Sequence, residues 1–254
     1  MTTPIYEARD IVRTYGSVRA LEGANFDVYP GEISALIGDN GAGKSTLVRI
    51  LAGADQANAG QILFNGEPIN LENPTDARRR GIETVFQDLA LANHLNPIQN
   101  MYLGRELMKR GFLGSLGFMQ RSEMRSQGRA AFSELGATVR NFSGPVGGMS
   151  GGQRQAIAVA RAAAWASEVI FLDEPTAALG VVQTKGVMDL IRRIRDKGIA
   201  VVLISHSMPH VLDVADRVHV LRHGKRVAVM DAKKTNVEEL VGAMTGALDG
   251  EEAA

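Results

Sequence analysis

Residues 38–46 read GDNGAGKST and match the pattern G-x-x-x-x-G-K-[ST] of a phosphate-binding loop. A triphosphate is held by several backbone N–H groups that point inward, and a tight glycine-rich turn allows this. Lys44 can reach the β- and γ-phosphates, and the Ser45 hydroxyl can bind Mg²⁺. The stretch before it, EISALI (32–37), predicts a buried strand, and the helix after it would direct its positive end at the anion. The residues expected around the phosphates are Gly38, Asp39, Asn40, Gly41, Ala42, Gly43, Lys44, Ser45 and Thr46. The alternative is a glycine-rich turn before an ordinary helix.

Composition is typical of a globular protein with a substantial core. Hydrophobic residues make up 45% of the 254 residues. Lys and Arg together number 28, as do Asp and Glu, so zero net charge argues against strong nucleic-acid binding. No cysteine is present, which excludes disulfides and fits a reducing compartment. The N-terminal MTTPIYEARD has no apolar segment typical of a secretory signal. The longest apolar run, IAVVLI (199–204), is far shorter than the about 20 residues that cross a membrane, so any membrane work needs other chains.

Strand and helix patterns alternate along the chain. Strands are expected at 5–15, 24–29, 32–37, 61–65, 82–87, 167–175 and 198–206, with hairpins over 54–70 and 217–230. Helices are expected from the phosphate loop to about Gly53, and over 96–110, 119–136, 155–166 and 181–198. The last fifteen residues (240–254) resemble a frayed acidic end. The alternation predicts an α/β fold with a mostly parallel sheet and helices on both faces.

An acidic pair follows the apolar strand at 169–172. The strand would deliver Asp173 and Glu174 to the carboxyl end of the sheet, where ligands bind in this architecture. Asp173 would support Mg²⁺ through its water shell. Glu174 would face the γ-phosphate and polarise the attacking water. The alternative is a strand that ends in two solvated acids.

A second anion-binding helix start is expected at residues 149–155, MSGGQRQ, just ahead of the helical pattern. Ser150 would cap the helix, and Gly151, Gly152 and Gln153 would expose backbone N–H groups; the alternative is a plain glycine-rich cap. S-G-G-Q followed by R-Q resembles the signature of ATP-binding-cassette (ABC) ATPases. The resemblance implies that this signature closes on the γ-phosphate held by the phosphate loop of another subunit.

The resemblance carries further residues with it. Tyr15 matches the aromatic side chain that stacks on adenine, Gln87 the glutamine that senses Mg²⁺ and water, and His206 the switch histidine at the γ-phosphate. Met149 replaces the more usual Leu. Gly180 stands where the family has an Asp that helps to join two subunits, so that loop is expected to differ. The implied catalytic residues are Glu174, His206, Gln87 and Lys44, and the implied metal ligands are Ser45, Gln87 and Asp173. The other four histidines are interpreted as structural or surface residues.

The resemblance covers about residues 4–245 and implies one ABC ATPase domain. A P-loop NTPase core with an antiparallel β subdomain would comprise 1–87 and 166–245, an inserted α-helical subdomain 88–165, and a tail 246–254. The sequence looks most like the ATPase subunits of bacterial monosaccharide (ribose, fructose or xylose-type) importers. The implied function is ATP hydrolysis that energises solute import.

The implied cofactors are ATP and Mg²⁺. The implied partners are a second nucleotide-binding subunit in a homodimer, membrane permease subunits that dock near residues 88–110 and, indirectly, a periplasmic or extracellular solute-binding protein, with no nucleic acid. The chain would lie at the cytoplasmic face of the cell membrane as a peripheral subunit.

Three alternatives stay open. One is a soluble ABC-class ATPase that acts on nucleic acid or ribosomes, but no sustained heptads or second cassette are present. Another is a small-molecule P-loop kinase, which would not need S-G-G-Q. The third is a cassette that binds nucleotide without hydrolysing it; Glu174 and His206 argue against this, although Gly180 keeps it open.

Overall fold

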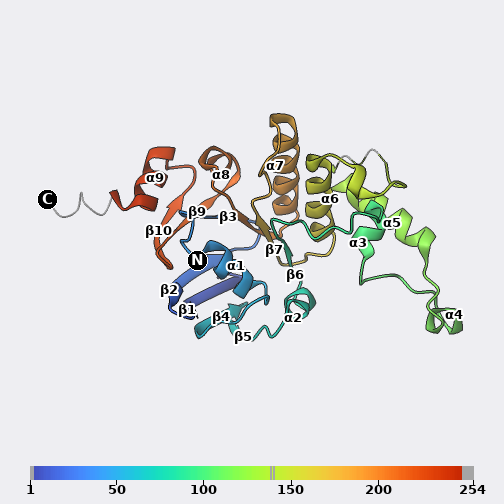
Figure 1. The fold of residues 1–254 in the computed structure, drawn as a ribbon, viewed down its shortest axis with the longest axis horizontal. Coiled ribbons are helices and arrows are strands. Elements are labelled where there is room, and N and C mark those ends of the chain that lie inside the picture. Colours follow the sequence, from blue (N-terminus) through green and yellow to red (C-terminus); the bar gives the residue numbers. More distant parts are fainter. Residues whose placement is uncertain (1–2, 138, 140, 248–254) are drawn as a thin grey trace.

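A mostly parallel sheet forms the centre of the molecule in the computed structural model, which describes residues 3–137, 139 and 141–247 (Figure 1). Within these residues, six strands lie in the order β10-β9-β3-β8-β7-β6. They are β3 (Ile33–Ile37), β6 (Ile82–Val85), β7 (Val169–Asp173), β8 (Ala200–Ile204), β9 (Arg217–Arg222) and β10 (Lys225–Asp231). All neighbours in this sheet are parallel except β10, which pairs with β9 as an antiparallel hairpin.

A second, antiparallel sheet packs beside the first. Its strand order is β2-β1-β4-β5, with β1 (Tyr6–Tyr15), β2 (Val18–Val28), β4 (Ala59–Phe64) and β5 (Glu67–Ile69). The expected hairpins at 54–70 and 217–230 are both present. The α/β fold with a mostly parallel sheet and an antiparallel β unit is therefore confirmed.

Helices follow and cover the strands. They are α1 (Lys44–Leu51), α2 (Pro74–Arg79), α3 (Pro97–Tyr102), α4 (Phe112–Ser115), α5 (Arg121–Glu134), the 3₁₀ turn η1 (Val146–Gly148), α6 (Gly151–Ala163), α7 (Val181–Asp196), α8 (Met208–Val214) and α9 (Val237–Thr245). Helices α3–α6 fall within residues 88–165: α6 lies beside α7, α3 and α5 lie farther out, and α4 lies at the end of the molecule opposite α9 (Figure 1).

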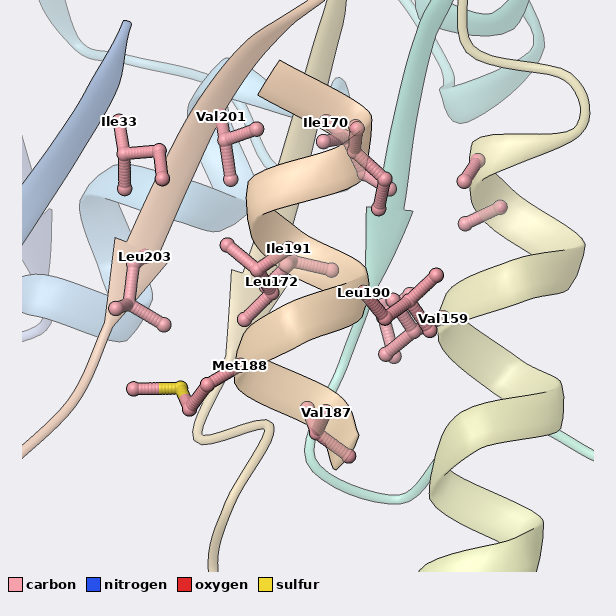
Figure 2. Packing of buried hydrophobic residues seen from close by; sticks show 14 of the residues in the cluster. Ile33, Val159, Ile170, Leu172, Val187, Met188, Leu190, Ile191, Val201 and Leu203 are labelled. Carbon is pink, nitrogen blue, oxygen red and sulfur yellow. The ribbon is translucent and has the colours of Figure 1, made fainter. Parts of the chain in front are cut away.

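Alternating side chains of the central strands build two cores. Leu172 and Leu203 point to the side covered by α6, α7 and α8, whereas Phe171 and Val202 point to the side covered by α1 and the antiparallel sheet. Figure 2 shows Ile191 of α7 against the strands that carry the first pair. Successive side chains of a strand point to opposite faces of the sheet. Because both faces are buried here, the strands are nearly continuous apolar runs in the sequence.

The helix expected over 96–110 is wrong beyond Tyr102. Helix α3 ends there because Gly104 adopts a left-handed φ of 76°, and the Glu106 carboxylate accepts a hydrogen bond from its N–H. Downstream, Met108 instead forms a β-bridge with Met119. The strand expected over 82–87 also ends earlier, at Val85, which leaves Gln87 in a turn.

The frayed end expected over 240–254 is wrong for residues 240–245, which belong to α9. Asn236 caps this helix by accepting the Glu239 N–H, and Leu240 and Ala243 are buried. Gly246 ends the helix with a φ of 84°. Residues 248–254 lie outside the described residues. Short helices α2 and α8 were not predicted, although each begins with a proline in its first turn, which is a typical start signal.

Candidate active site

The carboxyl ends of three adjacent strands bring the predicted residues to one edge of the sheet. Strand β8 lies between β3 and β7, and Ile204 is the registered partner of both Leu36 and Asp173. The phosphate loop leaves β3 just after this register, and His206 leaves β8 two residues after it. Parallel strands thus place the loop, the acidic pair and the histidine side by side.

The phosphate loop has the backbone that its glycines allow. Gly43 caps α1 with a φ of 101°, and a Cβ atom there would lie 2.5 Å from the Ala20 carbonyl oxygen. Gly41 also has a left-handed φ of 83°, and nothing lies within 4 Å of where its Cβ atom would be. The first turn of α1 contains no acidic side chain. The loop therefore presents an open, backbone-lined helix start to an anion.

The Lys44 ammonium lies inside this loop. It donates hydrogen bonds to the carbonyl oxygens of Gly38 at 2.7 Å and Asp39 at 3.0 Å. Burial lowers the pKa of Lys44, while Glu174, Asp173 and Asp39 oppose this shift. Gly38 and Ala42 are buried, Gly43, Lys44 and Thr46 are half-buried, and Asp39, Asn40, Gly41 and Ser45 are exposed.

Asp173 and Glu174 both interact with Lys44. Burial raises the pKa of Asp173; the neighbouring Glu174 raises it further, and Lys44 lowers it. Two acids beside one lysine leave excess negative charge at this edge, which favours a bound cation.

Glu174 has an unusual backbone and an unusual carboxylate. Its φ is 51°, which is uncommon for a residue with a side chain, and its N–H donates to the Ile204 carbonyl at 3.0 Å. Oε1 lies 2.9 Å from Nδ1 of the exposed His206. Oε2 is buried and finds no hydrogen-bond partner among the described residues. A carboxylate with one oxygen held and the other without a partner can accept a proton from a water molecule that reaches it.

Gln87 and Tyr15 make their contacts outside the cluster of Lys44, the acidic pair and His206. Gln87 is exposed in the turn after β6, at the same edge of the sheet as Asp173. Tyr15 ends β1, its hydroxyl bonds the Asp55 carboxylate, and the Arg13 guanidinium lies 4.6 Å from its ring centre. One ring face is thus occupied by Arg13. In the described part of the chain, no hydrogen bond or ion pair joins either residue to the phosphate loop.

Arg161 of α6 is a residue that sequence reasoning missed. Its guanidinium donates to the carbonyl oxygens of Ala90 at 2.7 Å and Leu89 at 3.1 Å. Both acceptor residues have left-handed φ values, 60° for Leu89 and 44° for Ala90. Burial lowers the pKa of Arg161. Arg161 therefore holds the strained turn after Gln87 against the helix that begins with the signature.

Removing this clamp should slow catalysis without weakening substrate binding. We expect Arg161→Ala to lower kcat for ATP hydrolysis about 10-fold, with KM within about twofold, because the turn that carries Gln87 relaxes. Arg161→Lys should recover part of the rate through a single bond. Steady-state kinetics measure both, with Arg79→Ala, whose side chain is 77% exposed, as the control. A rise in KM at unchanged kcat would contradict a positioning role.

The signature begins helix α6. The Ser150 hydroxyl accepts the Gln153 N–H at 3.3 Å, and the Gln153 side chain accepts the Ser150 N–H at 3.1 Å, which completes a capping box. A Cβ atom on Gly152 would lie 2.5 Å from Gln183 of α7, so this glycine allows close helix packing. Gly151 is exposed, with nothing within 4 Å of a Cβ position. Within the described residues, no hydrogen bond joins residues 150–153 to residues 38–46.

Gly180 caps α7 in an ordinary extended conformation, with φ −73° and ψ 166°. No side chain caps this helix, and a Cβ atom at Gly180 would meet only the movable Gln183 amide, at 2.7 Å. The backbone therefore does not require glycine here. An Asp at this position would fit the fold, so the substitution removes a carboxylate without being needed for the turn.

Three of the other histidines occupy different environments: a buried core, a contact between two segments and a turn. His219 is fully buried, which lowers its pKa to about 3, and its ring centre lies 4.4 Å from that of Phe26. His210 Nδ1 lies 3.2 Å from the Thr176 hydroxyl, so it links α8 to the segment after Glu174. His223 sits at the β9–β10 turn with a φ of 46°.

A mostly parallel α/β sheet that carries a phosphate loop, an acidic pair and a second capped helix start is typical of a nucleotide-binding protein. The family model described as "ABC transporter" matches residues 21–177. The chain belongs to the ABC transporter family, and as a member it binds ATP. The prediction of an ABC ATPase is confirmed.

Several characterised relatives align over nearly the whole chain. The fructose import ATP-binding protein FrcA of Rhizobium meliloti is 50% identical over 246 residues, which cover 96% of this chain and 95% of the relative. The xylose/arabinose import ATP-binding protein XylG of Sulfolobus acidocaldarius is 40% identical, covering 95% and 94%. The ribose import ATP-binding protein RbsA 2 of Escherichia coli O157:H7 is 41% identical, and this chain spans 47% of its length.

Solved structures agree on the fold. The ATP-binding cassette MJ1267 of an ABC transporter superposes with a TM-score of 0.80 at 25% identity, with 100% of both chains covered. The bacterial ABC transporter cassette MJ0796, described as dimeric, gives a TM-score of 0.76 at 24% identity, covering 91% of this chain and all of that one. Each helix in the described ranges falls short, in length or in hydrophobicity, of what crossing a bilayer requires.

Proposed function

We propose that this chain hydrolyses ATP as the energising subunit of an importer of a small solute, a monosaccharide such as fructose, xylose or ribose. The names of the similar proteins support the solute class. The observation that carries hydrolysis is the Glu174 carboxylate, which contacts His206 through one oxygen and has no partner among the described residues at the other, on the same sheet edge as Lys44. ABC-class activity on nucleic acid or ribosomes is not favoured.

Each residue at the edge has a role in this proposal. Lys44 pairs with the β- and γ-phosphates, exchanging its present carbonyl partners for phosphate oxygens. Glu174 Oε2 accepts the proton of the attacking water while that water's oxygen bonds to the γ-phosphorus and the bond to the β-phosphate oxygen breaks. His206 holds Oε1 and reaches the γ-phosphate from its exposed side. Gln87 orients the water, and Tyr15 stacks on the adenine.

Magnesium fits the donors present. Among the described residues, His, Cys, Asp and Glu side chains nowhere gather in threes that could hold a metal on their own. Mg²⁺ in nucleotide sites typically takes only one or two carboxylates from the protein and completes its shell with phosphate oxygens and water. We assign the Ser45 hydroxyl and Asp173 to this role, with Gln87 completing it. Burial raises the pKa of Asp173 and the neighbouring Glu174 raises it further, and a cation at this edge would favour the charged form of both acids. The ion would neutralise charge on the phosphates.

The signature completes the site from a second copy. Ser150, Gly151 and Gly152 make no hydrogen bond to their own phosphate loop in the described residues, and Gly151 is unobstructed. A head-to-tail pair would place this capped helix start against the γ-phosphate held by the other chain's Lys44. ATP closes the pair because the γ-phosphate accepts hydrogen bonds from both chains, and hydrolysis removes that link.

Mixing two inactive variants tests this composite site. Lys44→Ala and Ser150→Arg should each abolish hydrolysis alone, because each spoils both sites of a symmetric dimer. In a mixed dimer one site carries both defects and the other carries none. An equimolar mixture should therefore recover up to about a quarter of the native rate, since half of the dimers are mixed and half of their sites are intact.

The matched control is Ser126→Arg, which adds the same cation on the exposed face of α5 and should leave the rate unchanged. No recovery on mixing would mean that Ser150 acts on its own chain's nucleotide or not at all, and the composite site would be wrong.

The coupling partners follow from the same proposal. Residues 88–165 serve as the helical lobe, and the region 88–110, which follows Gln87 and is held by Arg161, docks a helix of a membrane permease. The chain is a peripheral subunit at the cytoplasmic face of the membrane, supplied indirectly by a solute-binding protein. ATP hydrolysis stimulated by the permease in liposomes, and absent with the permease alone, is the expected result.

A further inference from the structure

Residues 107–120, which we call the finger, project from the end of the molecule that carries α4 (Figure 1). Its base is an ordered antiparallel pairing. The Lys109 N–H donates to the Phe118 carbonyl at 2.7 Å, the Gln120 N–H donates to the Leu107 carbonyl at 2.6 Å, and Met108 bridges Met119. The finger is therefore a built element, held at its base and free at its tip.

The tip of the finger exposes four large apolar side chains. Around the single turn of α4, Phe112 is 77% exposed, Leu113 46%, Leu116 57% and Phe118 52%. Hydrophobic side chains that cluster at the surface mark a binding site. At about 100° per residue, Phe112, Leu113 and Leu116 lie on one side of this turn, with Gly114 and Ser115 behind them. The finger therefore presents one exposed apolar face, and the charges beside that face indicate what it binds.

The charges around the tip are positive. Residues 107–120 contain no acidic residue. Lys109, Arg110 and Arg121 are exposed, and none of them forms an ion pair within the described part of the chain. The acids nearest in sequence, Glu106 and Glu123, lie outside the finger, next to its base, where they accept hydrogen bonds from the Gly104 N–H and the Gln127 side-chain amide. Cations at the rim of an apolar tip complement anionic lipid headgroups.

We propose that the finger binds an anionic lipid surface, with Phe112, Leu113, Leu116 and Phe118 entering the headgroup boundary and Lys109, Arg110 and Arg121 at the phosphates. The proposal rests on the membrane-peripheral location proposed above and adds a direct lipid contact to it. The contact would anchor the end of the molecule that carries α3–α6, the segment proposed to meet the permease.

Vesicle flotation of the purified full chain, without nucleotide, tests the proposal. Vesicles of phosphatidylcholine with about 30% phosphatidylglycerol should carry the chain upward, vesicles of phosphatidylcholine alone should carry much less, and added salt should weaken binding. Phe112→Ser combined with Leu116→Ser should lower the partition coefficient at least about 30-fold, because the inserted area is lost. Lys109→Gln combined with Arg110→Gln should lower it about 10-fold and reduce its salt dependence.

The matched control is Val227→Ser combined with Val229→Ser, which removes two exposed valines from β10 and should leave flotation unchanged. A Trp placed at residue 112 (Phe112→Trp) should shift its emission to the blue on anionic vesicles, measured against the single native Trp165.

Three results would overturn the proposal. The native chain could ignore both kinds of vesicle, or the serine variant could float as well as the native chain. The variant could also lose self-association or permease binding while lipid binding is nil, which would assign the finger to a second copy or to the permease. The assay uses no nucleotide, so its outcome is independent of the mixing experiment that tests the composite ATP site.

Discussion

Glu174→Gln should lower the rate of ATP hydrolysis by about 10³-fold or more and leave ATP affinity within a few-fold of the native value. The amide keeps the size of the side chain but cannot accept a proton from water. In glutamine an NH₂ group replaces one of the two carboxylate oxygens, either the one that faces His206 or the buried, unpartnered Oε2. The variant therefore cannot both hold the histidine and accept a proton from water. Binding persists because Lys44 and the loop backbone are untouched.

The same variant should trap the closed pair. With ATP bound and not consumed, the γ-phosphate keeps linking two chains, so size-exclusion chromatography with ATP should show a stable dimer that the native chain forms only transiently. Glu168→Gln is the control, since it removes the same charge just before the opposite end of strand β7 and should hydrolyse ATP at the native rate. Near-native hydrolysis by Glu174→Gln would assign proton acceptance to another group.

The parts of the fold that could be predicted are those set by local periodicity. Strands β3, β7 and β8 are short and mostly apolar, so their positions are clear from the chain alone. The segment after Tyr102 was predicted as helix because its hydrophobic spacing suits one. Gly104 and the pairing of Met108 with Met119 override that spacing, and such a pairing depends on contacts that no local pattern encodes.

The active site divides in the same way. Lys44 and Asp173 were predicted from a glycine-rich loop and from an acidic pair at the end of an apolar strand, whereas His206 was predicted from its match to the family pattern. The clamp from Arg161 to the turn at Leu89 and Ala90 was missed because its donor and acceptors are far apart in sequence. An arginine amid alanines in an apolar helix was the available signal, since a buried guanidinium needs acceptors. The strained φ of Glu174 had no sequence signal at all.

Acid should lower the free energy of unfolding, in part because His219 takes up a proton when the chain unfolds. Burial lowers the pKa of this histidine from 6.5 to about 3; Asp27 opposes the shift, and Arg226 and Arg217 add to it. Between these two values the unfolded chain binds a proton that the folded chain does not, so stability is full above about pH 7 and falls as the pH drops. From pH 6.5 to 4.5 the loss from this residue should be about 2 kcal/mol of unfolding free energy.

His219→Leu should remove that step. Both ring nitrogens are buried without a hydrogen-bond partner among the described residues, and the ring packs on Phe26, so an apolar side chain of similar volume should fit with little change at pH 7. Urea unfolding at pH 7 and pH 4.5 measures the difference for each protein, and acidic groups elsewhere affect both alike. The native chain should lose on the order of 2 kcal/mol more than the variant. Equal losses would mean that His219 gains a partner or water when it is protonated, and that its burial does not govern the acid response.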